Sequence, residues 1–154
     1  MNSEFYSTLV HLHSIGRWLL MLALLTAIFR SLTARNRQFQ ISDQRMGTLL
    51  VIIIDLAVLT GLILWYLGPL RQLKGIGIED TMANSIARFF VLEHPFAMLV
   101  ALILIHLGKR QSRKQIPDSA KHRRTAAFYL IGLLIILISI PWPFLDNGTN
   151  GHWY

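Results

Sequence analysis

Four long apolar runs dominate this chain and limit it to few folds. They extend over residues 9–29, 46–70, 89–107 and 125–145. Each is close to the roughly 20 residues that a helix needs to cross the hydrocarbon core of a bilayer. Open-ended segments other than helices cannot cross, because lipid offers no hydrogen-bond partner to backbone N–H and C=O groups. The sequence therefore predicts an all-α integral membrane protein with a single domain over residues 1–154.

Basic residues are sorted along the chain, and their places predict the direction of each span. Eleven of the 15 Lys and Arg residues lie in two polar stretches, residues 30–45 and 109–124, together with only two acidic residues. Both stretches should face the cytoplasm by the positive-inside rule. Short loops then favour an up-down-up-down four-helix bundle with the N- and C-termini on the periplasmic side. This topology explains the net charge of +7, which gives no case for nucleic acid and indicates contact with the lipid bilayer.

Cysteine and the common catalytic motifs are absent from the sequence. Zero Cys excludes disulfides, thiolate metal sites, iron–sulfur clusters and covalent attachment of haem. The chain has no P-loop, no G-x-G-x-x-G after a strand, no H-E-x-x-H and no nucleophile elbow. These absences favour an electron-transfer protein over a stand-alone enzyme. They leave non-covalent haem with histidine ligands as the main option for a redox centre.

Two histidines are expected at the same depth in the membrane. His13 and His94 each lie a few residues below the outer start of a span, the first and the third. Both spans run inward and are diagonal neighbours in such a bundle, so the two imidazoles can face each other across its axis. Two neutral nitrogen ligands on opposite sides of a planar macrocycle are what a b-type haem needs, so we predict one haem b with His13 and His94 as axial ligands. Pro95 should kink the helix beside His94 and free a backbone carbonyl that can bind an imidazole N–H.

Helical phase separates His13 from its neighbour His11. At about 100° per residue the two are about 200° apart, so only one of them can face the core. Arg17 shares the face of His13 at i+4 and would be costly against lipid, which favours His13 and leaves His11 at the headgroup level. The cations on the outer side that can neutralise a haem propionate are Arg17, Arg71, Lys74 and Arg88.

A second haem near the cytoplasmic side stays open as a hypothesis. His106 follows His94 by twelve residues and is about 120° out of phase with it, which disfavours two haems stacked along one helix. His106 can instead be paired with His122, although His122 stands among basic residues and is expected to be solvated. A structural or interfacial role is the ordinary alternative for His106.

Two carboxylates also fall in or next to the spans. Asp55 lies near mid-membrane, and its simplest role is a buried, uncharged hydrogen bond to a neighbouring helix. Proton relay or contact with a quinone headgroup is the functional alternative. Glu93 is expected to form an ion pair with Arg17 or Arg88.

Several segments resemble a bacterial family. They are HLHSIGRW at residues 11–18, EHP at 93–95, IHLG at 105–108 and SIPWPF at 139–144, which look like the small four-helix membrane proteins of Bacteroidetes labelled cytochrome b. The likeness covers nearly the whole chain, including its length and the order of its spans. The resemblance implies a haem-b electron-transfer role in a bacterial inner membrane. Carried over by residue, it indicates His13, His94 and His106, with Arg17 and Glu93 close by.

The leading hypothesis is therefore a small membrane cytochrome that passes single electrons in a respiratory or redox chain. Its partners would be a quinone, a respiratory complex or a periplasmic electron carrier. The first alternative is a non-haem accessory or assembly subunit of a membrane complex, in which His13, His94 and the other buried polar residues pack helices together. The second is a proton or metal transporter, which needs a polar path from Asp55 to His106 or His94.

Overall fold

The computed structural model describes residues 3–34 and 36–142, and every regular element in these two ranges is a helix. The long helices are α1 Ser3–Thr33, α2 Ile41–Leu67, α6 His94–Arg110 and α7 Asp118–Ile138. The short elements are α3 Pro69–Ile76, α4 Ile78–Ala83, α5 Ser85–Arg88, the π-helical turn η1 Phe89–Glu93 and the 3₁₀ turn η2 Gln111–Arg113. The predicted all-α class is confirmed for the described residues.

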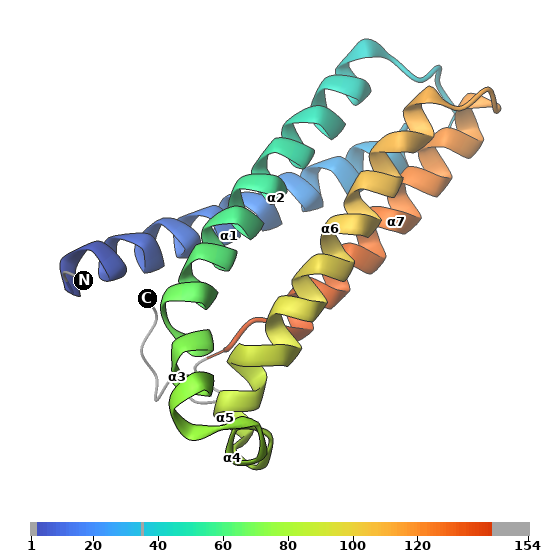
Figure 1. Cartoon of the computed structure of the whole chain (residues 1–154). Helices are drawn as coiled ribbons and strands as arrows, with labels where there is room; N and C mark the ends of the chain where they lie inside the picture. The colour runs from blue at the N-terminus through green and yellow to red at the C-terminus, as the bar shows by residue number, and fades with distance from the viewer. Residues whose placement is uncertain (1–2, 35, 143–154) are drawn as a thin grey trace.

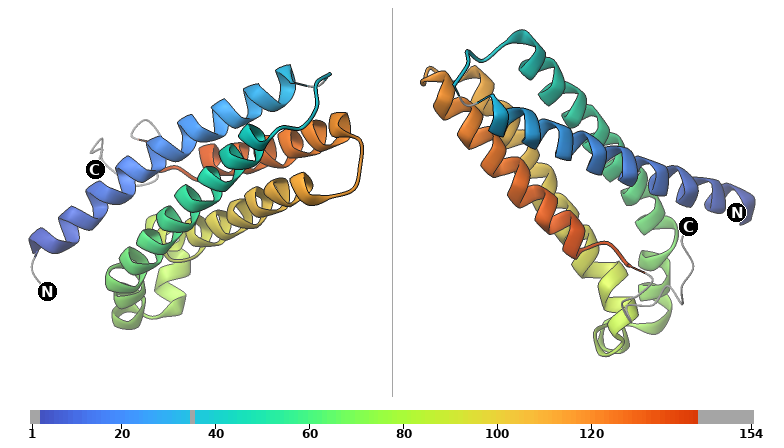
Figure 2. Two further views of the ribbon diagram at one scale, coloured as in Figure 1. Left: turned by 90° about the horizontal axis from the view of Figure 1, so that it is seen from above. Right: turned by 180° about the vertical axis from the view of Figure 1, so that it is seen from behind.

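The four long helices pack in a definite order. α1 packs against α2 and α7, and α6 packs against the same two helices. In Figure 1, α2, α6 and α7 run side by side, whereas α1 crosses them. The two views of Figure 2 show that the N-terminal half of α1 diverges from α7. The sequence predicts where the helices lie along the chain, but the crossing depends on how their side chains interlock.

Three helical segments are long and apolar enough to cross a membrane: Glu4–Thr33, Ile41–Ile76 and Ser85–Arg113. They contain the first three predicted spans. The fourth differs, because α7 ends at Ile138 and its apolar part, residues 125–138, is shorter than the roughly 20 residues of a full span. The predicted end of this span, near residue 145, lies outside the described residues.

The outer surface of the long helices is largely apolar. Large aliphatic and aromatic side chains are exposed on all four of them, with Leu22, Leu56, Phe96 and Ile138 as examples. The interior is filled by a smaller set of buried residues: Leu24, Leu50, Ile54, Ile105 and Tyr129. A water-soluble monomer rarely exposes so much apolar surface, whereas lipid is a favourable solvent for it.

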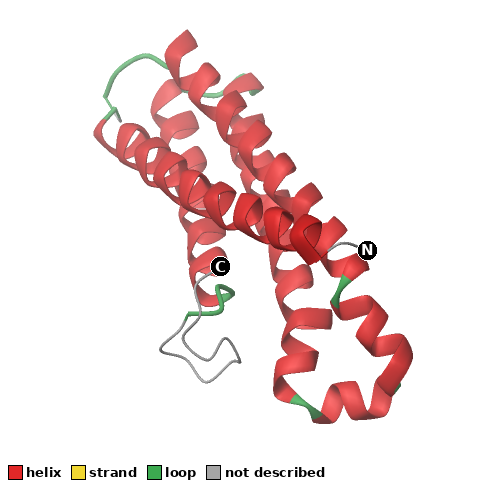
Figure 3. Ribbon diagram, turned by 90° about the vertical axis from the view of Figure 1, so that its left-hand side faces the viewer, coloured by secondary structure: helices red, strands yellow, loops and turns green. Residues whose placement is uncertain are grey.

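α3, α4 and α5 connect α2 to α6 at one end of the molecule. Figure 3 shows these short helices turning back on one another at that end. Gly77 has a φ of 86°, a left-handed conformation that glycine adopts without strain, and it separates α3 from α4. We call this end the α3–α5 end, and we call the opposite end, with residues 34, 36–40 and 111–117, the basic end.

Two prolines near the α3–α5 end interrupt helical hydrogen bonding, and a tryptophan compensates each time. Pro95 has no N–H to give to the carbonyl of Val91, and the indole N–H of Trp65 donates to that carbonyl at 2.9 Å. Pro141 likewise cannot bind the carbonyl of Leu137, which accepts the indole N–H of Trp142 at 2.8 Å. The predicted interruption beside His94 is found as the π-helical turn η1, but the carbonyl freed by Pro95 binds the Trp65 indole and not an imidazole.

Candidate functional site

The structure brings His13 and His94 together. His13 lies on α1 and His94 is the first residue of α6. Their ring centres are 6.4 Å apart and the ring planes meet at 80°. The Phe89 ring lies 5.8 Å from the His94 ring, and both histidines are partly buried. The predicted meeting of these two histidines is confirmed, because their spans run in the same direction and place them at the same height.

Each of the two rings is fixed by a backbone carbonyl of a different helix. Nδ1 of His13 lies 3.1 Å from the carbonyl oxygen of Ala57 on α2, and Nδ1 of His94 lies 2.8 Å from that of Ser139 at the end of α7. A carbonyl can only accept, so Nδ1 carries the hydrogen in both rings. The neutral imidazoles therefore keep a lone pair on Nε2. This tautomer is the one that suits a metal ligand whose second nitrogen is oriented by a hydrogen bond.

Gly61 lets α1 approach α2 closely enough for this contact. A Cβ atom at position 61 would lie 3.1 Å from Cε1 of His13, which is tighter than ordinary van der Waals contact. Thr60 lies beside the same ring, with its hydroxyl 3.5 Å from Nδ1 of His13. A larger residue at position 61 would push the imidazole away from Ala57.

The four cations predicted for the propionate side have different surroundings in the structure. Arg17 lies one turn after His13, half-buried, and is close enough to both imidazoles to act on them electrostatically. Arg88 forms an ion pair with Glu93 at 2.8 Å, one of the two pairings expected for that carboxylate. Arg71 and Lys74 are exposed on α3. His11 is exposed, in agreement with the helical phase that favours His13.

The two imidazoles fit a group that needs only axial ligands. A metal–imidazole bond is about 2 Å long. When the distance from each donor nitrogen to its ring centre is added on both sides, the centres of two imidazoles on one metal would be about 6 Å apart. The observed separation of 6.4 Å agrees, and an 80° angle is allowed because each ring can turn about its own bond. Within residues 3–34 and 36–142, no group of three or more His, Cys, Asp or Glu side chains is placed to hold a metal ion.

Asp55 is exposed, whereas the sequence predicts a buried side chain. Its side chain is 49% exposed on the outer face of α2, and its Oδ1 lies 3.5 Å from Nε2 of His106 on α6. The contact with a neighbouring helix is found, but helical phase turns the carboxylate outward and away from the core. The transporter hypothesis joined the same two residues, which here meet on the outer surface.

His122 is buried, which contradicts the expected solvation. It has no exposed surface, and its ring lies 4.8 Å from the Phe39 ring. The cause is tertiary: the backbone N–H of Phe39 donates to Asp118 at 3.1 Å and so fastens the α1–α2 loop over the start of α7. His106 is engaged with Asp55 on the outer face, so the two residues of the second-haem hypothesis have different surroundings.

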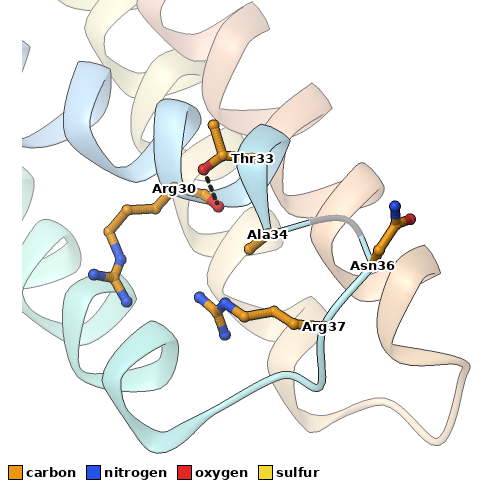
Figure 4. Close-up of a pocket in the computed structure, with 5 residues that line it drawn as sticks. All are labelled: Arg30, Thr33, Ala34, Asn36 and Arg37. Atoms are coloured by element: carbon orange, nitrogen blue, oxygen red, sulfur yellow. Dashed lines mark hydrogen bonds between the residues drawn. The ribbon is translucent and has the colours of Figure 1, made fainter.

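The basic end also contains a polar cluster that the sequence alone does not predict. Arg37 donates two hydrogen bonds of 2.7 Å to Asp43, and Arg30 donates one of 3.2 Å to the same carboxylate. Figure 4 shows both guanidinium groups extending toward the start of α2, beside a hollow of about 440 Å³. Nearby, Lys121 donates to Asp118 at 2.8 Å, and this hydrogen bond, with the one from Phe39, lowers the pKa of the Asp118 carboxyl.

Comparisons with protein-family models, curated proteins and solved structures give no match for this chain. A function therefore has to be argued from the residues themselves, and the His13–His94 pair is the strongest starting point.

Proposed function

We propose that the protein is a small membrane b-type cytochrome in which His13 and His94 are the axial ligands of one haem b. The observation that supports this is the pair itself: two imidazoles 6.4 Å apart, each with Nδ1 bound to a carbonyl of another helix. Bound haem supplies one-electron iron chemistry and needs no thiolate from the protein, which has no cysteine. Electron transfer rather than catalysis on a substrate is the activity that follows.

The residues around the pair have distinct roles in this proposal. His13 and His94 would hold the haem through their Nε2 atoms, and the carbonyls of Ala57 and Ser139 orient the two rings through Nδ1. Arg17 neutralises a propionate, since it is half-buried beside both imidazoles. Arg71 and Lys74 on α3, and Arg88 where its pair with Glu93 opens, are further cations for the propionate side.

The setting we propose is a four-helix bundle in a bacterial inner membrane, with both termini on the periplasmic side. Three segments that can cross a membrane, together with two basic stretches on one side of them, support this topology. The haem would then lie toward the periplasmic side, where it exchanges electrons with a quinone, a respiratory complex or a periplasmic carrier. One haem is proposed, because His106 and His122 do not form a comparable pair.

Absorption spectra of the purified protein test the proposal. The full chain is expressed with haem supplied, purified in detergent, and measured as oxidised and dithionite-reduced protein. We expect a low-spin, six-coordinate spectrum with a Soret band and an α-band on reduction. His13→Ala and His94→Ala should each lose haem or convert it to a high-spin form, because each removes one axial ligand.

His11→Ala is the matched control. His11 is two residues from His13 on the same helix, but it is exposed and should leave the spectrum unchanged. His106→Ala controls for the loss of a second histidine on α6. A haem-free spectrum of the wild type would overturn the proposal, and unchanged spectra in both His13→Ala and His94→Ala would move the ligands elsewhere.

A non-haem accessory subunit is the second candidate function. The same two hydrogen bonds favour it, because they tie α1 to α2 and α6 to α7 without any cofactor. This candidate predicts a haem-free spectrum, co-purification with a larger membrane complex, and loss of that complex in His13→Ala. The spectrum of the wild type separates the two functions directly.

A further inference from the structure

Asp55 and His106 form a polar pair in an apolar surface. Their side chains are 49% and 46% exposed, on the outer faces of α2 and α6. Several exposed residues around them are apolar: Ile52, Leu56, Leu59, Leu99 and Ile103. Asp55 lies in the middle of α2, whereas His106 is one turn before the end of α6, where Arg110 is exposed.

Two contacts orient the His106 ring. Nδ1 of His106 lies 3.0 Å from the carbonyl oxygen of Leu102, one turn earlier on α6; a carbonyl only accepts, so Nδ1 is the donor there. Nε2 of His106 lies 3.5 Å from Oδ1 of Asp55. A carboxyl group can make more than one hydrogen bond, so this single contact leaves part of its capacity unused.

Such a pair is costly against lipid. Ionisable side chains inside a membrane nearly always face the interior of a helix group or pair across helices, because hydrocarbon cannot solvate them. Within the described residues, the outer face of α2 and α6 leaves about half of each side chain open. The remaining hydrogen-bonding capacity of the carboxylate has to be satisfied from outside the chain.

We propose that a second copy of this chain covers the pair, in a dimer whose two-fold axis is parallel to the membrane normal. The proposal rests on the membrane topology given above and not on haem. All copies in one membrane share one orientation, so such an axis leaves the depth of every residue unchanged. The rotation also reverses the order of α2 and α6 across the interface, and it therefore places α2 of one copy opposite α6 of the other.

The acid–base pair is complementary to itself under this symmetry. The side-chain ends of Asp55 and His106 are 3.5 Å apart, so these ends lie at nearly the same depth. The two-fold axis then places each Asp55 opposite the partner's His106, and two reciprocal contacts satisfy all four side chains. Polar contacts of this kind hold membrane helices together where the hydrophobic effect gives no net attraction between them. The apolar residues around the pair supply the packing surface.

Mixing two complementary variants tests the dimer. Asp55→His gives a copy with two bases, and His106→Asp gives a copy with two acids. Both break the contact within one chain, and each alone would set like groups opposite each other in a dimer. Energy transfer between two fluorophores fused to separate copies is measured in liposomes over a range of protein-to-lipid ratios. We expect each variant alone to dimerise at least about tenfold more weakly than the wild type, and an equal mixture to recover association between unlike copies.

The mixture separates contact between chains from contact within a chain. Only a contact across the interface can be restored by mixing. Recovery in the mixture supports the proposal. Absence of energy transfer in the wild type at every ratio overturns it, and so does a mixture no stronger than either variant alone. Wild-type binding to a different membrane protein or to a lipophilic small molecule at this face, without self-association, would overturn it as well.

Disulfide trapping gives a second test that leaves the pair intact. The chain has no cysteine, so a single introduced Cys reports one position. Leu59 lies one turn to the outer side of Asp55, and Ile103 lies one turn to the outer side of His106, so both flank the pair on the same side. Differently tagged Leu59→Cys and Ile103→Cys copies should form mixed disulfides on oxidation. Leu22→Cys with Leu134→Cys, exposed on α1 and α7, is the matched control and should not, and equal trapping in both pairs would contradict the interface.

Discussion

The His13–His94 pair and the Asp55–His106 pair share one hydrogen-bond pattern but differ in which helices hold the rings. In His13, His94 and His106 alike, Nδ1 is bound to a backbone carbonyl. For His13 and His94 that carbonyl belongs to another helix, whereas for His106 it belongs to its own helix, one turn earlier. The first two rings are therefore fixed relative to the whole molecule. The third is fixed only relative to α6.

The difference in partners leads to different chemistry. His13 meets another base, and the 6.4 Å between their ring centres is compatible with the proposed pair of haem ligands. His106 meets an acid, and their single contact leaves part of the hydrogen-bonding capacity of the carboxylate unused. Rigid placement by other helices is what a ligand site needs, because small displacements of a ligand weaken binding. A surface pair needs only matching depth.

Gly61→Val should have the largest effect among changes that leave both histidines in place. A Cβ at position 61 already lies 3.1 Å from the His13 ring, and the two methyl groups of valine would displace the ring from the Ala57 carbonyl. Loss of such an orienting contact typically weakens metal binding by about 10- to 100-fold. We expect haem affinity to fall by that amount, as measured by haem titration of the apoprotein.

Gly16→Val is the matched control for this substitution. Gly16 lies on α1 near His13, but a Cβ there would meet no other atom within 4 Å. Haem affinity should stay at the wild-type value in this variant. Equal losses in Gly61→Val and Gly16→Val would show that the close contact with His13 has no special role.

The sequence predicted the depth of the histidines because depth follows from one-dimensional information. Apolar length, the places of the basic stretches and the rise of a helix together put His13 and His94 at one height. Helical phase also separated His13 from the exposed His11. The carbonyls of Ala57 and Ser139 could not be foreseen, because a backbone acceptor leaves no trace in the side-chain pattern.

The predictions that are wrong concern tertiary packing. Asp55 is predicted in the core, yet the phase of α2 against α6 places it on the outer face. His122 is predicted in water, yet the loop around Phe39 folds over it. Local periodicity contains no information on either contact.

Trp65→Phe should have a moderate effect on stability. It tests whether the helix beside His94 depends on the hydrogen bond from the Trp65 indole. The substitution removes the indole N–H that binds the Val91 carbonyl, which Pro95 leaves without a helical donor. The loss of one such hydrogen bond costs about 1 kcal/mol, or about 2–4 °C in the unfolding midpoint of a chain this size. Tyr66→Phe, at an exposed neighbouring position, should show no shift in thermal unfolding in detergent. Identical midpoints for the two variants would rule out a role for the Trp65 contact.

Asp118→Asn should have the smallest effect on stability. It tests the basic end, away from the His13–His94 and Asp55–His106 pairs. Lys121 and the Phe39 N–H lower the pKa of the Asp118 carboxyl in the folded protein below its value near 4 in an unfolded chain. A lowered pKa means that the stabilisation is complete above about pH 4 and is lost as the pH falls through the folded-state pKa. The wild type should therefore unfold at a slightly higher temperature than Asp118→Asn between pH 5 and pH 7, by about 1–2 °C, and this gap should close below about pH 4. Asp80→Asn on the exposed helix α4 serves as the control and should match the wild type throughout. A gap that persists unchanged into acid would mean that the charge of Asp118 does not cause it, and the absence of a gap between pH 5 and pH 7 would mean that the loop is held over His122 by packing against Phe39 alone.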